Sequence, residues 1–477
     1  MVNILWICTD QQRFDALGCY GNAVLDTPNL DSLAEKGVLF ENCYAQSPVC
    51  SPSRGSFLTG RYPRTCNMRQ NGAKIPSNEK LVTKIFEENG YLCGLSGKLH
   101  LAPCHPSVCP GIEERIEDGY SAFYWSHHST YDWPLNDYHL WLAEKGYEYH
   151  TAPYQNSRYV LEGMPEELHH SAYCTDRAIT FLRSAGRFHT PWLFSINYYD
   201  PHHDFDPPKR LLDKYMERLD QILLPNYQEG ELEHKPRFQR QDHSGAYAGN
   251  AGHAFTEMSE RDHKMHTAAY YAMVEMIDIQ VGRLLEALRE SGQDQDTLIV
   301  FHSDHGEMLG DHGIYLKGPY FYEGAVKVPL ILYWPGKLQE GKRVKGLVEL
   351  MDLPQTLLEL AGIPAPSSMM GKSFAALCTD QEAQKHRDSV YAEYYNAMPW
   401  HQSPKAFCTM VFDGRYKLVV CHGIGEGELY DLAQDPAETD NLWDSPESAN
   451  VKMKLLLLMT DRMAFTCDPL PERVSAW

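Results

Sequence analysis

A cysteine, a proline and an arginine lie at fixed offsets in the segment Cys50-Ser51-Pro52-Ser53-Arg54. Proline is favoured in the first turn of a helix, so the segment predicts a helix that begins near Cys50. The free N–H groups and the positive dipole end of a helix N-terminus attract anions, and Arg54 follows one turn later. Buried structural cysteines are common, but the flanking proline and arginine favour an anion site beside Cys50.

Polar residues directly follow two predicted strands. The apolar run Ile4–Cys8 leads to Asp10-Gln11, and the run Thr297–His302 leads to Asp304-His305. In open α/β sheets, functional sites lie at the carboxyl ends of the strands. Either aspartate alone would more simply cap a following helix. Together, two carboxylates, an amide and an imidazole favour a cation site.

Short buried strands alternate with helices along most of the chain. A strand buried on both faces is a short apolar run, and a glycine just past a periodic segment marks a helix end. This alternation predicts an α/β sandwich with a large, mostly parallel sheet flanked by helices. The expected strands are Ile4–Cys8, Trp192–Tyr198, Thr297–His302 and Val328–Tyr333, and the expected helices are Asn29–Lys36, Leu81–Asn89, His266–Glu290 and Asp352–Ala361.

The pattern changes toward the C-terminus, where short strands separated by turn residues replace the alternation. These strands are Val390–Tyr395, Ala406–Phe412 and Tyr416–Cys421, and a helical run follows at Val451–Met463. We expect a catalytic domain over residues 1–373 and a smaller C-terminal domain with an antiparallel sheet over residues 374–477. The polar stretch over residues 204–262 is expected to form a surface excursion, such as a lid or a substrate-pocket wall.

Length and charge limit the class of protein. The chain has 477 residues, more than one hydrophobic core usually holds, and a formal net charge of −21. Such acidity disfavours nucleic acid and anionic membranes as partners. The 13 cysteines are scattered, unlike the framework of a small secreted domain, and the N-terminus resembles no signal peptide. We therefore expect a cytoplasmic protein with reduced thiols.

A series of motifs in order along nearly the whole chain resembles the type I sulfatases of the alkaline phosphatase superfamily. The Cys-x-Pro-x-Arg motif at Cys50 is one of them. The other matching blocks are Thr9–Arg13, Leu17–Gly21, Thr27–Asp31, Gly97–Leu101, Asp200–His202, Ser303–Glu307, Lys317-Gly318, Arg415–Leu418, Glu428–Leu432, Asp435-Pro436 and Asn441-Leu442. The resemblance implies an alkaline-phosphatase-like sandwich that hydrolyses an organic sulfate ester to an alcohol and inorganic sulfate.

In that family the motif cysteine is converted to formylglycine, and the resemblance implies this modification of Cys50 by a maturation enzyme. A hydrated aldehyde carries two hydroxyl groups. One of them attacks sulfur and displaces the alcohol, which leaves a covalent sulfated diol. The second hydroxyl can then lose its proton and expel sulfate, which regenerates the aldehyde. A plain serine or cysteine lacks that second hydroxyl.

The resemblance also implies a divalent metal, held by Asp10, Gln11, Asp304, His305 and the modified Cys50. Many relatives carry Asp-Asp and Asp-Asn at the two strand ends, so Gln11 removes one negative charge and His305 adds a nitrogen ligand. Calcium is favoured, manganese accepts nitrogen more readily, and magnesium is a further alternative. Phosphonate monoester hydrolases and phosphodiesterases of the superfamily use similar shells, so their activity is the alternative function. An unmodified metal-binding protein without turnover is the alternative of another class.

Five further side chains have roles implied by the same resemblance. Arg54, Lys98 and Lys317 would stabilise negative charge on the diol and the sulfate group. His202 would protonate the leaving oxygen, and His100 would hold or deprotonate the second hydroxyl. His203 beside His202 is the competing assignment, and the preceding Pro201 favours His202.

The alcohol part of the substrate is not determined by these motifs. A sulfated carbohydrate is favoured, and an aryl sulfate is the alternative. Aromatic side chains of the protein can pack against the ring of either one. The aromatic-rich stretch Tyr120–Trp141 and residues 204–262 are the expected contact regions. A weaker cluster, His100, Cys104, His105 and Cys109, lacks a paired zinc signature, so its cysteines are interpreted as structural.

Overall fold

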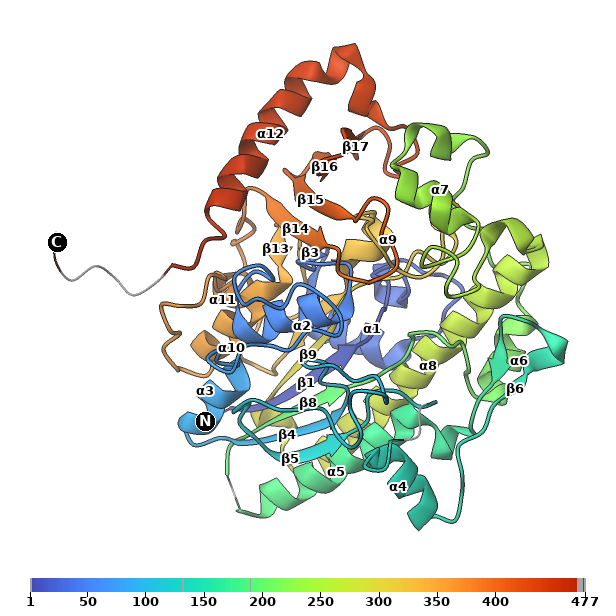
Figure 1. Ribbon diagram of the computed structural model, residues 1–477. Coiled ribbons are helices and arrows are strands. Elements are labelled where there is room, and N and C mark those ends of the chain that lie inside the picture. The colour runs from blue at the N-terminus through green and yellow to red at the C-terminus, as the bar shows by residue number, and fades with distance from the viewer. Residues whose placement is uncertain (1, 131–132, 189, 470–474, 476–477) are drawn as a thin grey trace.

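An eight-stranded sheet with the order β12-β2-β11-β9-β1-β8-β4-β5 forms the centre of the protein. The computed structural model describes residues 2–130, 133–188, 190–469 and 475 (Figure 1). Every strand of this sheet except β11 runs in the same direction, which confirms the expected mostly parallel sheet. The strands are β1 (Asn3–Thr9), β2 (Val38–Phe40), β4 (Leu92–Gly97), β5 (Tyr120–Trp125), β8 (Trp192–Asn197), β9 (Thr297–Ser303), β11 (Leu330–Tyr333) and β12 (Lys342–Val344).

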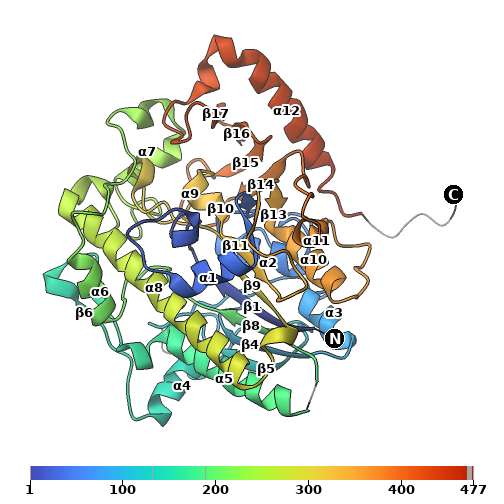
Figure 2. The same cartoon turned by 180° about the vertical axis from the view of Figure 1, so that it is seen from behind.

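Helices cover both faces of the sheet (Figure 2). Successive strand side chains point to opposite faces, so Leu5 and Ile7 of β1 enter one hydrophobic core while Ile4 and Trp6 enter the other. The first core is closed by α1 (Pro28–Lys36), α5 (His170–Phe188) and α8 (Glu260–Glu290), and the second by α2 (Cys50–Thr59), α3 (Val82–Glu88) and α10 (Leu353–Leu360). Burial on both faces explains why the strands are short apolar runs.

The expected strand Val328–Tyr333 is divided in two. Its first residues belong to β10 (Lys327–Val328), which pairs with β3 (Cys43–Tyr44) in a small sheet that also holds β13 (Val348–Glu349). Its last residues form β11, which runs antiparallel to β9. Pro329 lies between the two strands, and proline cannot donate a ladder hydrogen bond.

Two of the larger differences from expectation have a clear physical cause. Helix α8 begins at Glu260 rather than His266, because Ser259 and Asp262 form a reciprocal capping box. Strand β4 was absent from the expected set because Gly94 and Gly97 interrupt its apolar run. A Cβ atom on Gly94 would lie 2.6 Å from the Phe194 ring, so close packing of β4 on the sheet needs a glycine there.

The expected antiparallel sheet near the C-terminus is confirmed, with one strand more than predicted. It has the order β14 (Val390–Tyr395), β15 (Phe407–Phe412), β16 (Tyr416–Cys421) and β17 (Glu426–Asp431). Helix α12 (Ala449–Ala464) lies beside this sheet (Figure 1). Its Leu455 and Met459 side chains pack against residues of β15, β16 and β17. The domain boundary at residue 373 stays a prediction.

Residues 204–262 form an excursion that carries α6 (Lys209–Met216) and α7 (Arg237–His243). Across the described parts of the chain, no helix combines the length and apolar character needed to span a membrane.

A buried ion-pair network joins β13 of the small sheet, and the helical turn that follows it, to the C-terminal region. Asp352 accepts a hydrogen bond from Arg387 Nε at 2.6 Å, and Glu349 Oε2 lies 3.2 Å from Arg387 Nη1. Arg462 of α12 also donates to Glu349. Burial alone would raise the pKa of Asp352, but Arg387 holds it well below its usual range.

We expect Asp352→Asn to destabilise the fold by about 3 kcal/mol, the lower end for breaking a buried ion pair, because Arg387 would lose the closer of its two carboxylate partners and keep only Glu349. The pKa of Asp352 is lowered in the folded state, so its contribution is present above the unfolded pKa of about 3.9 and is lost as the pH falls further. The thermal midpoint at pH 7, followed by circular dichroism, measures the effect.

The matched control is Asp388→Asn, which removes an exposed partner of Lys385 in the same segment. Its thermal midpoint should stay at the wild-type value. Equal shifts for the two variants would show that the buried network contributes no special stability.

Candidate active site

Four neighbouring strands lead to most of the predicted site residues at one edge of the sheet. Adjacent in the order β9-β1-β8-β4, they lead into Asp304-His305, Asp10-Gln11, His202 and Lys98 respectively. Cys8 of β1 is level with His302 of β9 and Asn197 of β8, so the carboxyl ends of these strands lie side by side. The backbone N–H of Asp304 donates to the Thr9 carbonyl at 3.1 Å, which fixes the two strand ends together.

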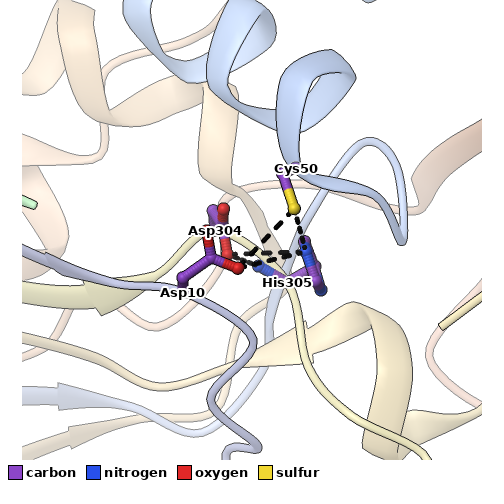
Figure 3. A group of neighbouring side chains, drawn as sticks. All are labelled: Asp10, Cys50, Asp304 and His305. Atoms are coloured by element: carbon purple, nitrogen blue, oxygen red, sulfur yellow. Dashed lines mark hydrogen bonds and ion pairs between the residues drawn. The ribbon is translucent and has the colours of Figure 1, made fainter. Parts of the chain in front are cut away.

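Asp10, Cys50, Asp304 and His305 form a compact buried cluster (Figure 3). One potential ligand atom from each residue lies within 4.8 Å of the others. Asp10, Asp304 and His305 follow the ends of strands, and Cys50 lies at the N-terminus of α2. The structure therefore brings together residues that the sequence predicted from distant segments.

His305 is oriented by its own backbone environment. Its Nδ1 lies 2.8 Å from the Gly306 carbonyl oxygen, so Nε2 faces the cluster. That Nε2 is 3.7 Å from Asp304 Oδ1, 3.8 Å from Asp10 Oδ1 and 3.2 Å from Cys50 Sγ. Metal-binding histidines commonly use the other ring nitrogen on a backbone carbonyl in this way. Two carboxylates, an imidazole and the side chain at position 50 fit a divalent cation.

Cationic side chains hold the outer oxygen of each carboxylate. Arg54 Nε donates to Asp304 Oδ2 at 2.8 Å, and Arg54 Nη2 donates to Asp10 Oδ2 at 3.2 Å. Lys98 Nζ lies 2.5 Å from the same Asp10 oxygen. Burial would raise the pKa of Asp10, but Lys98 and Arg54 lower it well below its usual range. The carboxylate therefore stays ionised, and its Oδ1 atom is directed at the cluster.

The thiol of Cys50 lies in a positive environment. Cys50 is the first residue of α2, and Pro52 lies in the first turn as predicted. Burial and the charge of Asp10 raise the pKa of the Cys50 thiol, but Lys317, Lys98 and His305 outweigh them and lower it. An anion next to residue 50 is favoured by the same charges and by the helix N-terminus.

Lys317 links Gln11 to His202. Its Nζ donates to Gln11 Oε1 at 2.5 Å and lies 2.6 Å from His202 Nε2. Burial lowers the pKa of His202 well below its usual range, and the charge of Lys317 lowers it further. The imidazole is therefore neutral at pH 7. The Gln11 amide also donates to Glu307. Both ends of that amide have protein partners, and metal ligation by Gln11 stays a prediction.

Two supporting residues were not singled out from the sequence. Tyr199 lies two residues after the end of β8, and its hydroxyl is 2.6 Å from His202 Nδ1. Glu307 accepts from Gln11 and from the backbone N–H groups of Leu309 and Leu316. Glu307 lies inside the block Ser303–Glu307 that resembles the family, and this position could have indicated its importance. Tyr199 carried no signal, because tyrosines are frequent in this chain.

His100 lies at a strained backbone position next to the cluster. Its φ is 63°, and its buried Nδ1 has no hydrogen-bond partner among the described residues. The Glu113 carboxylate holds this loop. It accepts hydrogen bonds from the backbone N–H groups of His100 at 2.8 Å and Ala102 at 2.9 Å, and from Trp125 Nε1 at 3.1 Å. Glu113 is one of several acidic residues in this loop, so the sequence does not indicate that it holds the backbone of His100.

The weaker cysteine cluster has a structural environment. Cys104 lies within ligand distance of Glu113 and His127, but the Glu113 carboxylate is occupied by N–H donors. Cys104 and Cys109 pack against Trp125 and Trp133 in a small hydrophobic cluster. These contacts support the structural interpretation of both cysteines.

Comparison with known proteins agrees with the geometry of the site. Residues 2–363 match the family described as Sulfatase, and residues 310–464 match the family described as N-sulphoglucosamine sulphohydrolase, C-terminal. An arylsulfatase of Clostridium perfringens is 32% identical over 93% of this chain and 91% of its own length. Human iduronate 2-sulfatase is 30% identical over 95% of this chain and 93% of its own.

Solved structures share the fold. A phosphonate monoester hydrolase from Silicibacter pomeroyi matches with a TM-score of 0.85 at 24% identity, over 98% of this chain and 96% of its own. A structure solved in complex with its substrate D-glucosamine-2-N,6-O-disulfate matches with a TM-score of 0.77 at 21% identity, over 99% of this chain and 100% of its own. The family match covers most of the chain, and the chain therefore belongs to the sulfatase family of sulfuric ester hydrolases.

Proposed function

We propose that this protein hydrolyses an organic sulfate ester through a formylglycine formed from Cys50. The observation that carries the proposal is the convergence of Arg54, Lys98 and Lys317 on a buried cysteine at a helix N-terminus. Fixed positive groups of this kind stabilise the charge that develops on a transferring sulfate group. The relatives named arylsulfatase and iduronate 2-sulfatase support a sulfate ester as substrate.

We further propose that Asp10, Asp304 and His305, with residue 50 and the amide oxygen of Gln11, hold one divalent metal ion. Calcium is favoured by the carboxylates, and the nitrogen of His305 keeps manganese and magnesium as alternatives. A bound ion would help to deprotonate a hydroxyl of the modified residue 50 at neutral pH. Formation of formylglycine requires a maturation enzyme as a partner. The catalytic residues all lie within residues 1–373, which supports the proposed catalytic domain.

The chain's own residues supply charge and protons. Lys98 and Lys317 would bind the sulfate oxygens, while Arg54 holds both carboxylates in place. His202 Nε2 and Lys317 Nζ are 2.6 Å apart and can share one proton, so this pair would deliver a proton to the leaving oxygen. The Nδ1 atom of His100, which has no hydrogen-bond partner in the described part of the chain, would accept the proton of the second hydroxyl of residue 50.

A phosphonate monoester or a phosphodiester is the second candidate substrate. Two phosphonate monoester hydrolase structures match this chain over nearly its whole length, with TM-scores of 0.85 and 0.83. The ligand set of two carboxylates and one imidazole does not discriminate between the two ester classes. The Lys98 and His100 side chains come from the block that resembles sulfatases, which favours the sulfate ester.

Parallel assays decide between these substrates. The purified enzyme, made together with its maturation enzyme, should release 4-nitrophenol from 4-nitrophenyl sulfate with a kcat/KM at least about tenfold above that for 4-nitrophenyl phenylphosphonate, a difference of about 1.4 kcal/mol. The physical reason is that a sulfate ester offers three non-bridging oxygens to Lys98, Lys317 and a bound cation, whereas a phosphonate monoester of the same charge offers two. A phosphonate rate that exceeds the sulfate rate by orders of magnitude would assign the second function.

The modified cysteine can be observed directly. Mass spectrometry of the tryptic peptide that contains Cys50 should show an aldehyde in place of the thiol. Cys50→Ala should lose activity by at least about a thousandfold because the nucleophile is removed, with an unchanged thermal midpoint. Cys467→Ala, at an exposed cysteine, is the matched control and should remain fully active. An intact Cys50 thiol in fully active enzyme would contradict the mechanism.

A further inference from the structure

A continuous row of rings runs from the site toward the surface. His202 and His203 are stacked with ring centroids 4.1 Å apart, His203 lies 5.9 Å from Tyr247, and Tyr247 is stacked on Trp400 at 6.4 Å. We call His203, Tyr247 and Trp400 the aromatic wall. The wall combines the segment after β8, the loop after α7 and the loop between β14 and β15. Three regions far apart in the sequence therefore meet beside the catalytic groups.

Two polar atoms of the wall lack protein partners within the described chain. Tyr247 is 7% exposed, and its hydroxyl has no hydrogen-bond partner there. The Nδ1 atom of His203 is buried and equally unpartnered among those residues. Buried polar groups are nearly always hydrogen-bonded, so each exception calls for an explanation. A hydroxyl or ring oxygen of a bound substrate would satisfy both groups.

The wall lies within electrostatic reach of the reacting centre and is itself uncharged. Burial raises the pKa of Tyr247, and the charges of Glu307, Cys50 and Asp10 raise it further. Burial lowers the pKa of His203 well below its usual range, with Lys317 acting in the same direction. Both rings are neutral at pH 7. The positive charge of the site is thus confined to the residues around position 50.

The outer end of the wall is open to solvent. Trp400 is 38% exposed, although large aromatic side chains are usually buried. Its ring lies nearly parallel to that of Tyr247, at an interplanar angle of 17°. An aromatic face of this kind packs well against another flat or apolar ring face.

We infer that the aromatic wall binds the alcohol part of the ester, and that this alcohol is an uncharged six-membered ring with an apolar face, either an aryl group or a pyranose. The inference rests on the proposed function of the site for the ester group. Trp400 stacks on the ring, and Tyr247 donates a hydrogen bond to a ring substituent. A short acyclic alkyl sulfate fills the charged site without reaching Trp400.

Binding to an unreactive form tests the inference without turnover. In a Cys50→Ala background, isothermal titration calorimetry measures the Kd of 4-nitrophenyl sulfate, glucose 6-sulfate and ethyl sulfate. We expect Trp400→Ala to weaken binding of at least one ring ester about tenfold through loss of stacking, and Tyr247→Phe about threefold. Ethyl sulfate should bind equally to all variants. The ring ester that loses more affinity identifies the aryl or the sugar class.

Phe465→Ala is the matched control, because Phe465 is an exposed aromatic residue of the same chain that lies outside the wall. Trp400→Ala should keep the wild-type thermal midpoint, since its ring is part-exposed. Three results would overturn the inference. The first is an unchanged Kd for both ring esters in Trp400→Ala, and the second is an equal loss of affinity for ethyl sulfate. The third is that neither ring ester binds to the Cys50→Ala parent. Failure of the proposed function is distinguishable, because it would appear as a lack of sulfate release by wild-type enzyme.

Discussion

Two fully buried carboxylates, Asp10 and Asp304, set the main constraint on this structure. Burying an ionised carboxylate costs several kcal/mol unless cationic partners and hydrogen bonds compensate it. Arg54 meets this requirement by bridging both residues, with Lys98 as a second partner of Asp10. The bridge fixes helix α2 against the ends of β1 and β9, and this contact places Cys50 at the cluster. The outer oxygens are held by Arg54 and Lys98, and the inner oxygens face the cluster, where Asp304 Oδ1 also accepts the backbone N–H groups of Gln11 and His305.

The charge distribution resolves an apparent conflict between the protein and an anionic substrate. The chain carries a net charge of −21, which should repel anions at long range. At the site, however, Arg54, Lys98 and Lys317 gather around one buried position, and the aromatic wall beside them is neutral. This arrangement fits a single sulfate group on an uncharged ring. An extended polyanion would meet the acidic surface instead.

Sequence reasoning predicted the parts of the site that local patterns determine. Asp10 and Asp304 directly follow apolar strands, and the Cys-x-Pro-x-Arg spacing places Cys50 and Arg54 one helical turn apart. Long-range packing decided the remainder. The antiparallel direction of β11 is set by its pairing with β9 and β2, and Gly94 of β4 is explained only by its close contact with Phe194. Tyr247 and Trp400 meet only in the folded chain, so no spacing in the sequence could have paired them.

The most direct test of this account is an anomalous diffraction experiment on crystals grown with Mn²⁺. The account predicts one strong anomalous peak within bonding distance of Asp10 Oδ1, Asp304 Oδ1 and His305 Nε2. The peak should disappear in Asp304→Ala crystals while the strands keep their positions. A wild-type crystal with a well-ordered cluster and no peak at these three atoms would contradict the claim that the buried carboxylates are arranged to hold a cation.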